Sequence, residues 1–343
     1  MNVLSRSGNI PRYRKDGDKL LVSCLWVLLV ACELFVLNSA PIFVNLFGNC
    51  NLQLYLCNMI HILFDKADKV RWVRNIASFV NLHCNSTSGE EVVIDFSNEI
   101  LPHELKPFHL ASLACLVQFF VDKNFPVSIS RDNKDVCQYV CDTCGFSTYW
   151  RLGFRHALST EKSIFSLWKI KDDEKDIFAS EVTKYFKGII GEDKDYTPIS
   201  TCLAEAYNNV FDHAQANGNA FSAIYYNQKN GKINVAICDF GISIPSSVRA
   251  FLENETNDKE ALEIAIKKNF TVQSQQNNRG FGLDNILTNS DNVRLFSKGA
   301  CLVKIDGKQH ISQTDFNFTG TLIDFDIDTQ NLEEEDILTD FDF

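Results

Sequence analysis

Glu205 and Asn209 are the residues whose types and spacing most directly suggest chemistry. They lie four positions apart in residues 203–214 (LAEAYNNVFDHA), a stretch with helical periodicity, so they share one face of the expected helix. An amide oxygen suits a hard cation such as Mg²⁺, and a neighbouring carboxylate can accept a proton. Taken alone, the segment also fits an ordinary helix whose polar face meets solvent.

Two further segments place glycines beside predicted elements. Residues 232–238 (KINVAIC) read as a strand that runs directly into Asp239 and Gly241. Residues 279–286 (RGFGLDNI) place glycines immediately before a helix, where amides left accessible by the missing Cβ form an anion site. A dinucleotide-binding motif does not fit there, because these glycines follow a polar loop instead of a strand.

Together these segments resemble the ATP-binding domain of the gyrase, heat-shock chaperone, histidine kinase and mismatch-repair ATPase superfamily (GHKL), with its histidine kinase-like ATPases. The resemblance covers its N-box, its two glycine boxes and a terminal Gly-Thr at residues 319–321, in the family's order. The long polar segment 246–279 resembles the family's ATP lid.

The resemblance implies ATP and Mg²⁺ as cofactors and assigns roles to individual residues. Glu205 would be the catalytic base that orients the attacking water, and Asn209 would be the Mg²⁺ ligand. Asp239 would accept a hydrogen bond from the adenine amino group, beside Gly241. The other residues that the resemblance assigns to the nucleotide are Asp212, His213, Arg279, Gly280, Gly282 and Thr321.

Two departures from the family pattern are visible. Ser243 stands where the second glycine of the first box is usual, which keeps a small side chain there. The family's Gly-Thr near the end of the lid is replaced by residues 271–274 (TVQS).

We expect an α/β (α+β) chain with two folded domains. The resemblance implies that residues 175–330 form the GHKL α/β sandwich, a mostly antiparallel mixed sheet with helices on one face and ATP between helices and lid. In the smaller domain, residues 66–165, strands at 91–97 and 126–130 flank a helix at 105–121, as in a βαβ unit.

This order resembles the STAS fold of anti-sigma factor antagonists. Those proteins are phosphorylated on a serine at the start of the corresponding helix, but residues 102–107 (PHELKP) contain none. Residues 103–108 also resemble a histidine kinase phosphoacceptor box. Pro107 would interrupt the long helix that such a box requires, so we rank autophosphorylation on His103 low.

Residues 1–65 are expected to be an apolar, helical extension. Residues 20–37 are almost continuously apolar after a basic flank and are about long enough to span a bilayer. A single span would place the ATP-binding domain outside the cytosol. We therefore expect first a buried or partner-covered helix, second a membrane anchor and last a signal peptide.

Composition narrows the partners and the compartment. The net charge of the 343-residue chain is −11, which opposes binding of nucleic acid. The twelve cysteines are mostly single and lie in apolar runs, which favours a reducing, cytoplasmic location. Cys141 and Cys144 have the spacing of half a zinc site, but no second pair accompanies them. Residues 331–343 form an acidic tail.

Two classes of function remain open. The first is an ATP- and Mg²⁺-binding signalling or regulatory enzyme, either a slow ATPase or a serine-protein kinase like the anti-sigma factor kinases. The alternative is a nucleotide-switched protein-interaction module without significant turnover. Both imply a regulatory protein partner.

Overall fold

The computed structural model describes residues 2–3, 59–87, 89–152, 161–213, 220–267 and 282–334. The chain divides into two units, residues 1–5 with 58–343, and residues 6–57. The apolar helix predicted at residues 20–37 lies outside the described residues, and residues 60–64, which belong to the predicted helical extension of residues 1–65, form a strand. Among those that are described, no helix combines the length and the apolar character needed to cross a bilayer.

The smaller sheet is built from residues near the N-terminal end of the described chain. Its strands follow the order β1-β4-β3-β2, and β2, β3 and β4 run parallel. The strands are β1 (Asn2–Val3), β2 (Ile60–Phe64), β3 (Val92–Phe96) and β4 (Val127–Ile129). Parallel strands need crossover connections, which α2 (Lys69–Leu82) and α3 (Pro107–Asp122) supply. The predicted strand, helix and strand are confirmed.

Short helices surround this sheet. They are η1 (Pro102–Glu104), α4 (Lys134–Gln138), the π-helical turn η2 (Tyr139–Thr143) and α5 (Phe146–Leu152). Exposed His103 lies in η1, and α3 begins at Pro107, since proline is tolerated in the first turn of a helix. His103 therefore lies in a single short helical turn and not in a long helix, as the position of Pro107 predicts.

The larger sheet has five strands in the order β5-β6-β7-β9-β8, and every neighbouring pair is antiparallel. The strands are β5 (Ile164–Lys169), β6 (Ala220–Asn227), β7 (Lys232–Asp239), β8 (Asn292–Ile305) and β9 (Lys308–Asp328). The accompanying helices are η3 (Asp172–Glu174), α6 (Lys175–Ile190), α7 (Thr197–Asn208), η4 (Asn209–His213), α8 (Ile244–Leu252), α9 (Asp258–Ala265), α10 (Gly282–Asn289) and η5 (Thr329–Asn331). The expected α+β class is confirmed.

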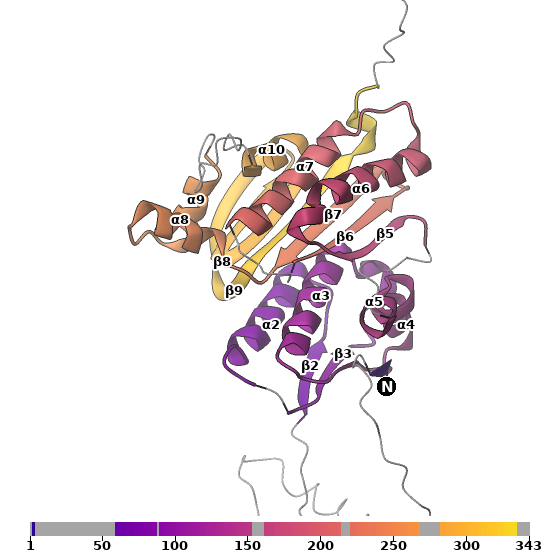
Figure 1. Ribbon diagram of the computed structural model, residues 1–343, viewed down its shortest axis with the longest axis vertical. Helices are drawn as coiled ribbons and strands as arrows, with labels where there is room; N and C mark the ends of the chain where they lie inside the picture. Colours follow the sequence, from indigo (N-terminus) through magenta and orange to yellow (C-terminus); the bar gives the residue numbers. More distant parts are fainter. Residues whose placement is uncertain are drawn as a thin grey trace, which may run out of the picture. The chain divides into compact units, whose positions relative to one another are not determined.

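Both faces of the larger sheet carry helices. Helices α6, α7 and α10 lie over one face (Figure 1), whereas α2 and α3 contact β6, β7 and β9 from the other. The helices of residues 175–330 thus lie on one face, as expected, but the cover of the other face by α2 and α3 was not predicted. Its physical reason is a long-range contact: the helices of the first region bury their apolar sides against a sheet formed more than a hundred residues later.

A shared hydrophobic core joins the two sheets. Phe108 of α3 is fully buried and lies 6.1 Å, centroid to centroid, from the ring of Phe296 in β8. Trp72 of α2 stacks on Phe64 of β2 within the same core. Because each fully buried side chain of this size contributes about 1.5–3 kcal/mol, this junction is a major source of stability.

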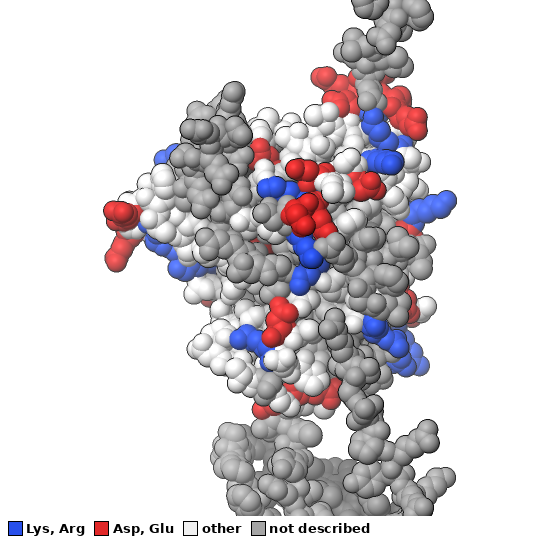
Figure 2. All heavy atoms as spheres, viewed as in Figure 1, with Lys and Arg blue, Asp and Glu red and all other residues white. Residues whose placement is uncertain are grey.

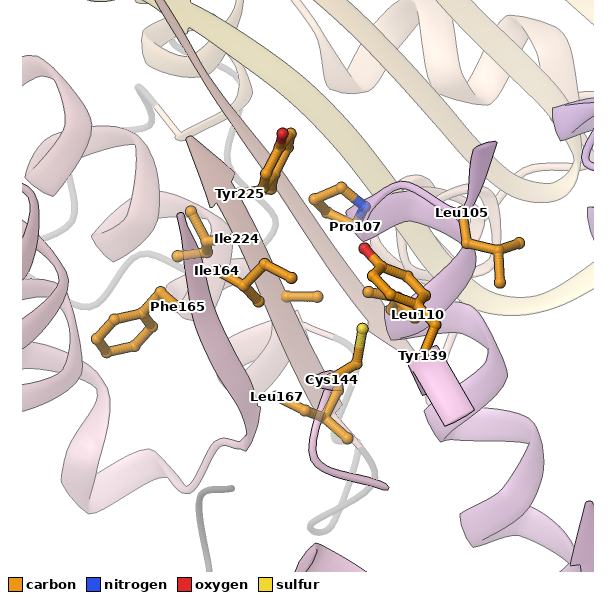
Figure 3. A pocket seen from close by; sticks show the side chains of 11 residues that line it. Leu105, Pro107, Leu110, Tyr139, Cys144, Ile164, Phe165, Leu167, Ile224 and Tyr225 are labelled. Carbon is orange, nitrogen blue, oxygen red and sulfur yellow. The ribbon is translucent and has the colours of Figure 1, made fainter. Parts of the chain in front are cut away.

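The junction leaves little empty space. A cavity lies between α3, η2 and the strands β5 and β6 (Figure 3), and its volume is about 10 Å³. Leu110, Tyr139, Cys144 and Ile164 are among its lining residues. This volume is near the minimum for one water, and the lining is largely apolar. Residues 59–152 and the larger sheet thus meet in a closely packed contact.

The cysteines of the Cys141 segment are part of this core. Cys137, Cys141 and Cys144 are buried free thiols in and beside η2. Burial raises the pKa of Cys141 and of Cys144 to about 12. Thiols that stay protonated in this way behave as small apolar side chains and not as nucleophiles.

Candidate functional site

Asp239 is the last residue of β7 and only 1% exposed. Its Oδ1 accepts the backbone N–H of Gly241 at 2.8 Å, and its carboxylate also accepts the backbone N–H of Thr321. Burial raises the pKa of Asp239 to about 7, despite these two donors. A carboxylate has about four acceptor positions, so this one retains capacity for a further donor.

Gly320 makes the close approach of β9 to Asp239 possible. Its φ is +76°, and a Cβ built there would lie 2.2 Å from the Asp239 carbonyl oxygen and 2.7 Å from Oδ1. No other residue fits this position without displacing the backbone. Thr321, which the resemblance assigns to the nucleotide, contacts Asp239 through its backbone N–H.

The surrounding strand differs from the expected one. The Gly-Thr at residues 319–321 lies inside β9 and not before the start of a strand, and Thr321 pairs with Asp239. The Thr321 hydroxyl lies 3.1 Å from Ser297 Oγ of β8. A strand of 21 residues reaches this far because β8 and β9 form a long hairpin with an irregular register between Ser297 and Ala300.

Ser243, at the position of the family's second glycine, starts α8. Its side chain accepts the N–H of Ser246 as the N-cap, and the next N–H, of Ile244, donates to Ser297 Oγ at 2.9 Å. An N-cap serine typically stabilises a helix by about 1 kcal/mol compared with alanine. The serine therefore has a structural role that fixes the loop after Asp239.

Glu205 and Asn209 both lie where α7 passes into η4. The helix begins at Thr197, earlier than the predicted residue 203, because Pro198 is accepted in its first turn. At Asn209 the hydrogen-bonding pattern changes to that of a π-helix, a feature often found at functional sites. Asn209 Nδ2 is buried without a hydrogen-bond partner among the described residues. Such a donor costs about 1–3 kcal/mol, which a ligand could recover.

Asn285 is a site residue that sequence reasoning missed. Its Nδ2 donates to Glu205 Oε1 at 3.0 Å and thereby ties α7 to α10. The hydrogen bond fixes one oxygen of the carboxylate and orients the other. The only sequence signal is a polar residue on the helix after the glycines, 80 positions from its partner.

The remaining predicted residues are described in part. Gly282 is the first residue of α10, so this glycine stands at a helix N-terminus as predicted. Arg279 and Gly280 lie outside the described residues. The backbones of Asp212 and His213 lie in η4, but their side chains are not among those described.

The first part of the predicted lid, which began at residue 246, is helical. Helices α8 and α9 contact each other, and Arg249 Nη1 donates to Asp258 Oδ1 at 2.7 Å. Asp258 Oδ2 also accepts the N–H of Gly299 at 3.1 Å, which anchors this helix pair to β8. The base of the segment is thus held by partly buried polar contacts.

The site has two polar ends on one face of the sheet. Asp239 and Thr321 lie on the side of the sheet that α6, α7 and α10 cover, since their neighbours Ile237 and Ile323 belong to the core beneath those helices. In the part of the chain that the structure describes, no hydrogen bond joins this end to the Glu205–Asn285 pair. A ligand that contacts both ends would have to bridge two separate polar groups.

Comparison with known proteins adds no family assignment: no family model matches the chain, and no curated protein matches its sequence.

The distribution of surface charge does not indicate a class of ligand. Figure 2 shows Lys and Arg interspersed with Asp and Glu on the face in view, without a continuous basic surface. That face lacks the electrostatic footprint of a polyanion-binding protein.

Proposed function

We propose that this chain binds ATP with Mg²⁺ on the face of the larger sheet that α7 and α10 cover, and that it belongs to the GHKL type. The observation that carries the proposal is Asp239. Its carboxylate is buried, held by two backbone donors and approached by β9 at a point where only Gly320 fits. Such an acceptor suits the amino group of adenine.

The other polar end suits the phosphates. The N-terminus of α10 carries a partial positive charge and free N–H groups that favour anions. Asn209 would hold Mg²⁺ through its amide oxygen, with phosphate and water oxygens as further ligands. Mg²⁺ would supply neutralisation of the phosphate charge. An elongated nucleotide would reach both ends.

Glu205 favours a reaction of the bound ATP instead of binding without reaction. Asn285 holds its Oε1, so Oε2 remains to accept a proton from water or from a serine hydroxyl. The proposed activity is therefore slow ATP hydrolysis or phosphotransfer to a serine of a protein partner. A cytoplasmic, reducing location is part of this proposal because ATP and free thiols are found there.

One observation favours the alternative, a nucleotide-switched interaction module. At and near the start of α8, Ile242 is 41% exposed, and Phe251 on the same helix is 50% exposed. Phe251 lies on the segment that corresponds to the lid, and Ile242 lies four residues before that segment begins. A nucleotide that repositions this segment would change the surface offered to a regulatory protein partner.

Incubation of the full chain with γ-labelled ATP and Mg²⁺ tests both classes. Labelled free phosphate supports hydrolysis, and labelled protein supports phosphotransfer. Bound but unreacted ATP supports the switch. Loss of the protein label in His103→Ala would assign the label to His103, an outcome that we do not expect because His103 lies in a short helical turn. If the protein neither binds nor turns over ATP, the proposal is wrong.

A further inference from the structure

A polar groove lies on the opposite face of the larger sheet, where α2 and α3 leave it partly uncovered. Its volume is about 320 Å³. It is lined by β7, β8 and β9 and by the first residues of α2 and α3. The charged and amide side chains that matter here are Lys69, Lys106, Asn234, Arg294, Asp324 and Asp326.

The strand register explains why the groove is polar. Asp324 is paired with Arg294 of β8 on one side, and Asp326 is paired with Asn234 of β7. Two residues further along the same face, Leu322 belongs to the apolar core beneath α2 and α3. The sheet face therefore changes from apolar to polar where its helical cover ends.

Both carboxylates of the groove already have cationic partners. Lys69 Nζ pairs with Asp324, and Lys232 Nζ donates to Asp326 Oδ1 at 3.1 Å. Asn292 Nδ2 donates to both oxygens of Asp326, at 3.1 and 3.0 Å. The acidic side chains are thus neutralised and largely satisfied within the protein.

Two cations and one amide are left over. Within residues 59–87, 89–152, 161–213, 220–267 and 282–334, no hydrogen bond or close ion pair satisfies the Arg294 guanidinium or the Asn234 amide, although Arg294 faces Asp324 across the strands and attracts its carboxylate electrostatically. Lys106 Nζ lies 5.8 Å from the Tyr225 ring centroid and has no acceptor in the same ranges. The groove therefore offers an excess of positive donors in a chain whose net charge is −11.

The chemistry of these donors selects the ligand. A guanidinium presents a planar fork that matches the paired oxygens of a carboxylate or a phosphate, and Lys106 adds a point charge at the N-cap of α3. The volume is at the lower end of the range of about 300–1,000 Å³ for small-molecule sites. A small anion fits both the charge and the size.

We propose that this groove binds a small anion through phosphate or carboxylate groups, with Arg294 and Lys106 as its main contacts. The site is separate from the Asp239 site, because its strand residues point to the other face of the sheet. Binding of an anion in the groove is therefore independent of nucleotide binding at the Asp239 site.

Calorimetric titration of the full chain with inorganic phosphate and with citrate tests the site. At least one probe should bind with a dissociation constant in the millimolar range or below. Arg294→Gln and Lys106→Gln should each weaken that binding by about tenfold or more, as loss of a charge-assisted hydrogen bond does. Arg151→Gln and Lys229→Gln are matched controls, because both side chains are exposed elsewhere and should leave binding unchanged.

The result also separates the two ligand chemistries. Tighter binding of phosphate points to a phosphorylated ligand, and tighter binding of citrate points to a polycarboxylate. The proposal is overturned if neither probe binds, or if binding persists unchanged in both groove variants. Should Arg294→Gln fail to fold, as judged by its thermal unfolding, Lys106→Gln decides, because Lys106 Nζ donates no hydrogen bond to the described residues.

Discussion

The two faces of the larger sheet use the same strands for different purposes. Cys238 and Asp239 are adjacent in β7 and point to opposite faces. The Cys238 carbonyl accepts the thiol of Cys115 within the apolar core below α3, whereas Asp239 keeps a buried carboxylate with spare capacity. Where α2 and α3 cover it, the first face contributes its side chains to stability, whereas the covered part of the second face retains a buried carboxylate that the fold alone does not satisfy. Substitutions on the two faces should therefore have separable effects.

The largest expected effect on function is that of Glu205→Ala. It should leave ATP binding nearly intact and reduce hydrolysis or transfer by about 10²–10⁴, the usual cost of losing a general base. Release of labelled phosphate measures the rate. Glu181→Ala, on the exposed side of α6, is the matched control. Equal rates for the parent and for Glu205→Ala would exclude Glu205 as the base.

The largest expected effect on stability is on the other face. Phe108→Ala removes a fully buried ring between α3 and β8 and should lower the free energy of unfolding by about 3–5 kcal/mol. Urea unfolding followed by tryptophan fluorescence and by circular dichroism measures it. Phe251→Ala, at a half-exposed ring, should cost much less. If only one of the two probes shifts in Phe108→Ala, the two sheets do not share one cooperative core.

Asp239→Asn should change the pH dependence of stability. The pKa of Asp239 is raised from 3.8 to about 7, so its contribution to stability is complete below about pH 4 and is lost as the pH rises through 7. The parent should therefore lose on the order of 4 kcal/mol over this interval that the variant does not lose. Urea midpoints at about pH 4 and about pH 8 measure the difference. Parallel pH profiles would show that the carboxyl titrates normally.

Asn285→Ala should have the smallest effect. Loss of one hydrogen bond to a charged group should reduce kcat by about tenfold and leave KM nearly unchanged, because Asn285 acts through Glu205. Asn289→Ala, at an exposed position of the same helix, is the control. A rise in KM at constant kcat would instead place Asn285 in contact with the nucleotide.

Local patterns predicted much of the fold. The strands at 91–97, 126–130 and 232–238 were found within two residues because β-branched, apolar runs between polar residues specify a buried strand. Helix α7 was placed too late, since the Thr197–Pro198 start signal lies outside its apolar repeat. Arg279 and Gly280 stay predictions.

Contacts between distant residues could not be predicted. The hydrogen bond between Asn285 and Glu205 joins two helices, and the cover of the larger sheet by α2 depends on tertiary docking. Neither contact produces a repeating pattern of apolar residues that could be recognised in the sequence. The position of Gly320 inside β9 was missed for a related reason, because a glycine usually interrupts a strand and here allows one to pass Asp239.

Equilibrium titration of the parent and of Asp239→Asn with ATP and Mg²⁺ tests the central claim most directly. Asp239 is proposed to accept the adenine amino group, and a charge-assisted hydrogen bond is worth about 1.5–3 kcal/mol. We expect the parent to bind ATP and Asp239→Asn to bind it at least about tenfold more weakly. Equal affinity of the two proteins, or no binding by the parent, would contradict it.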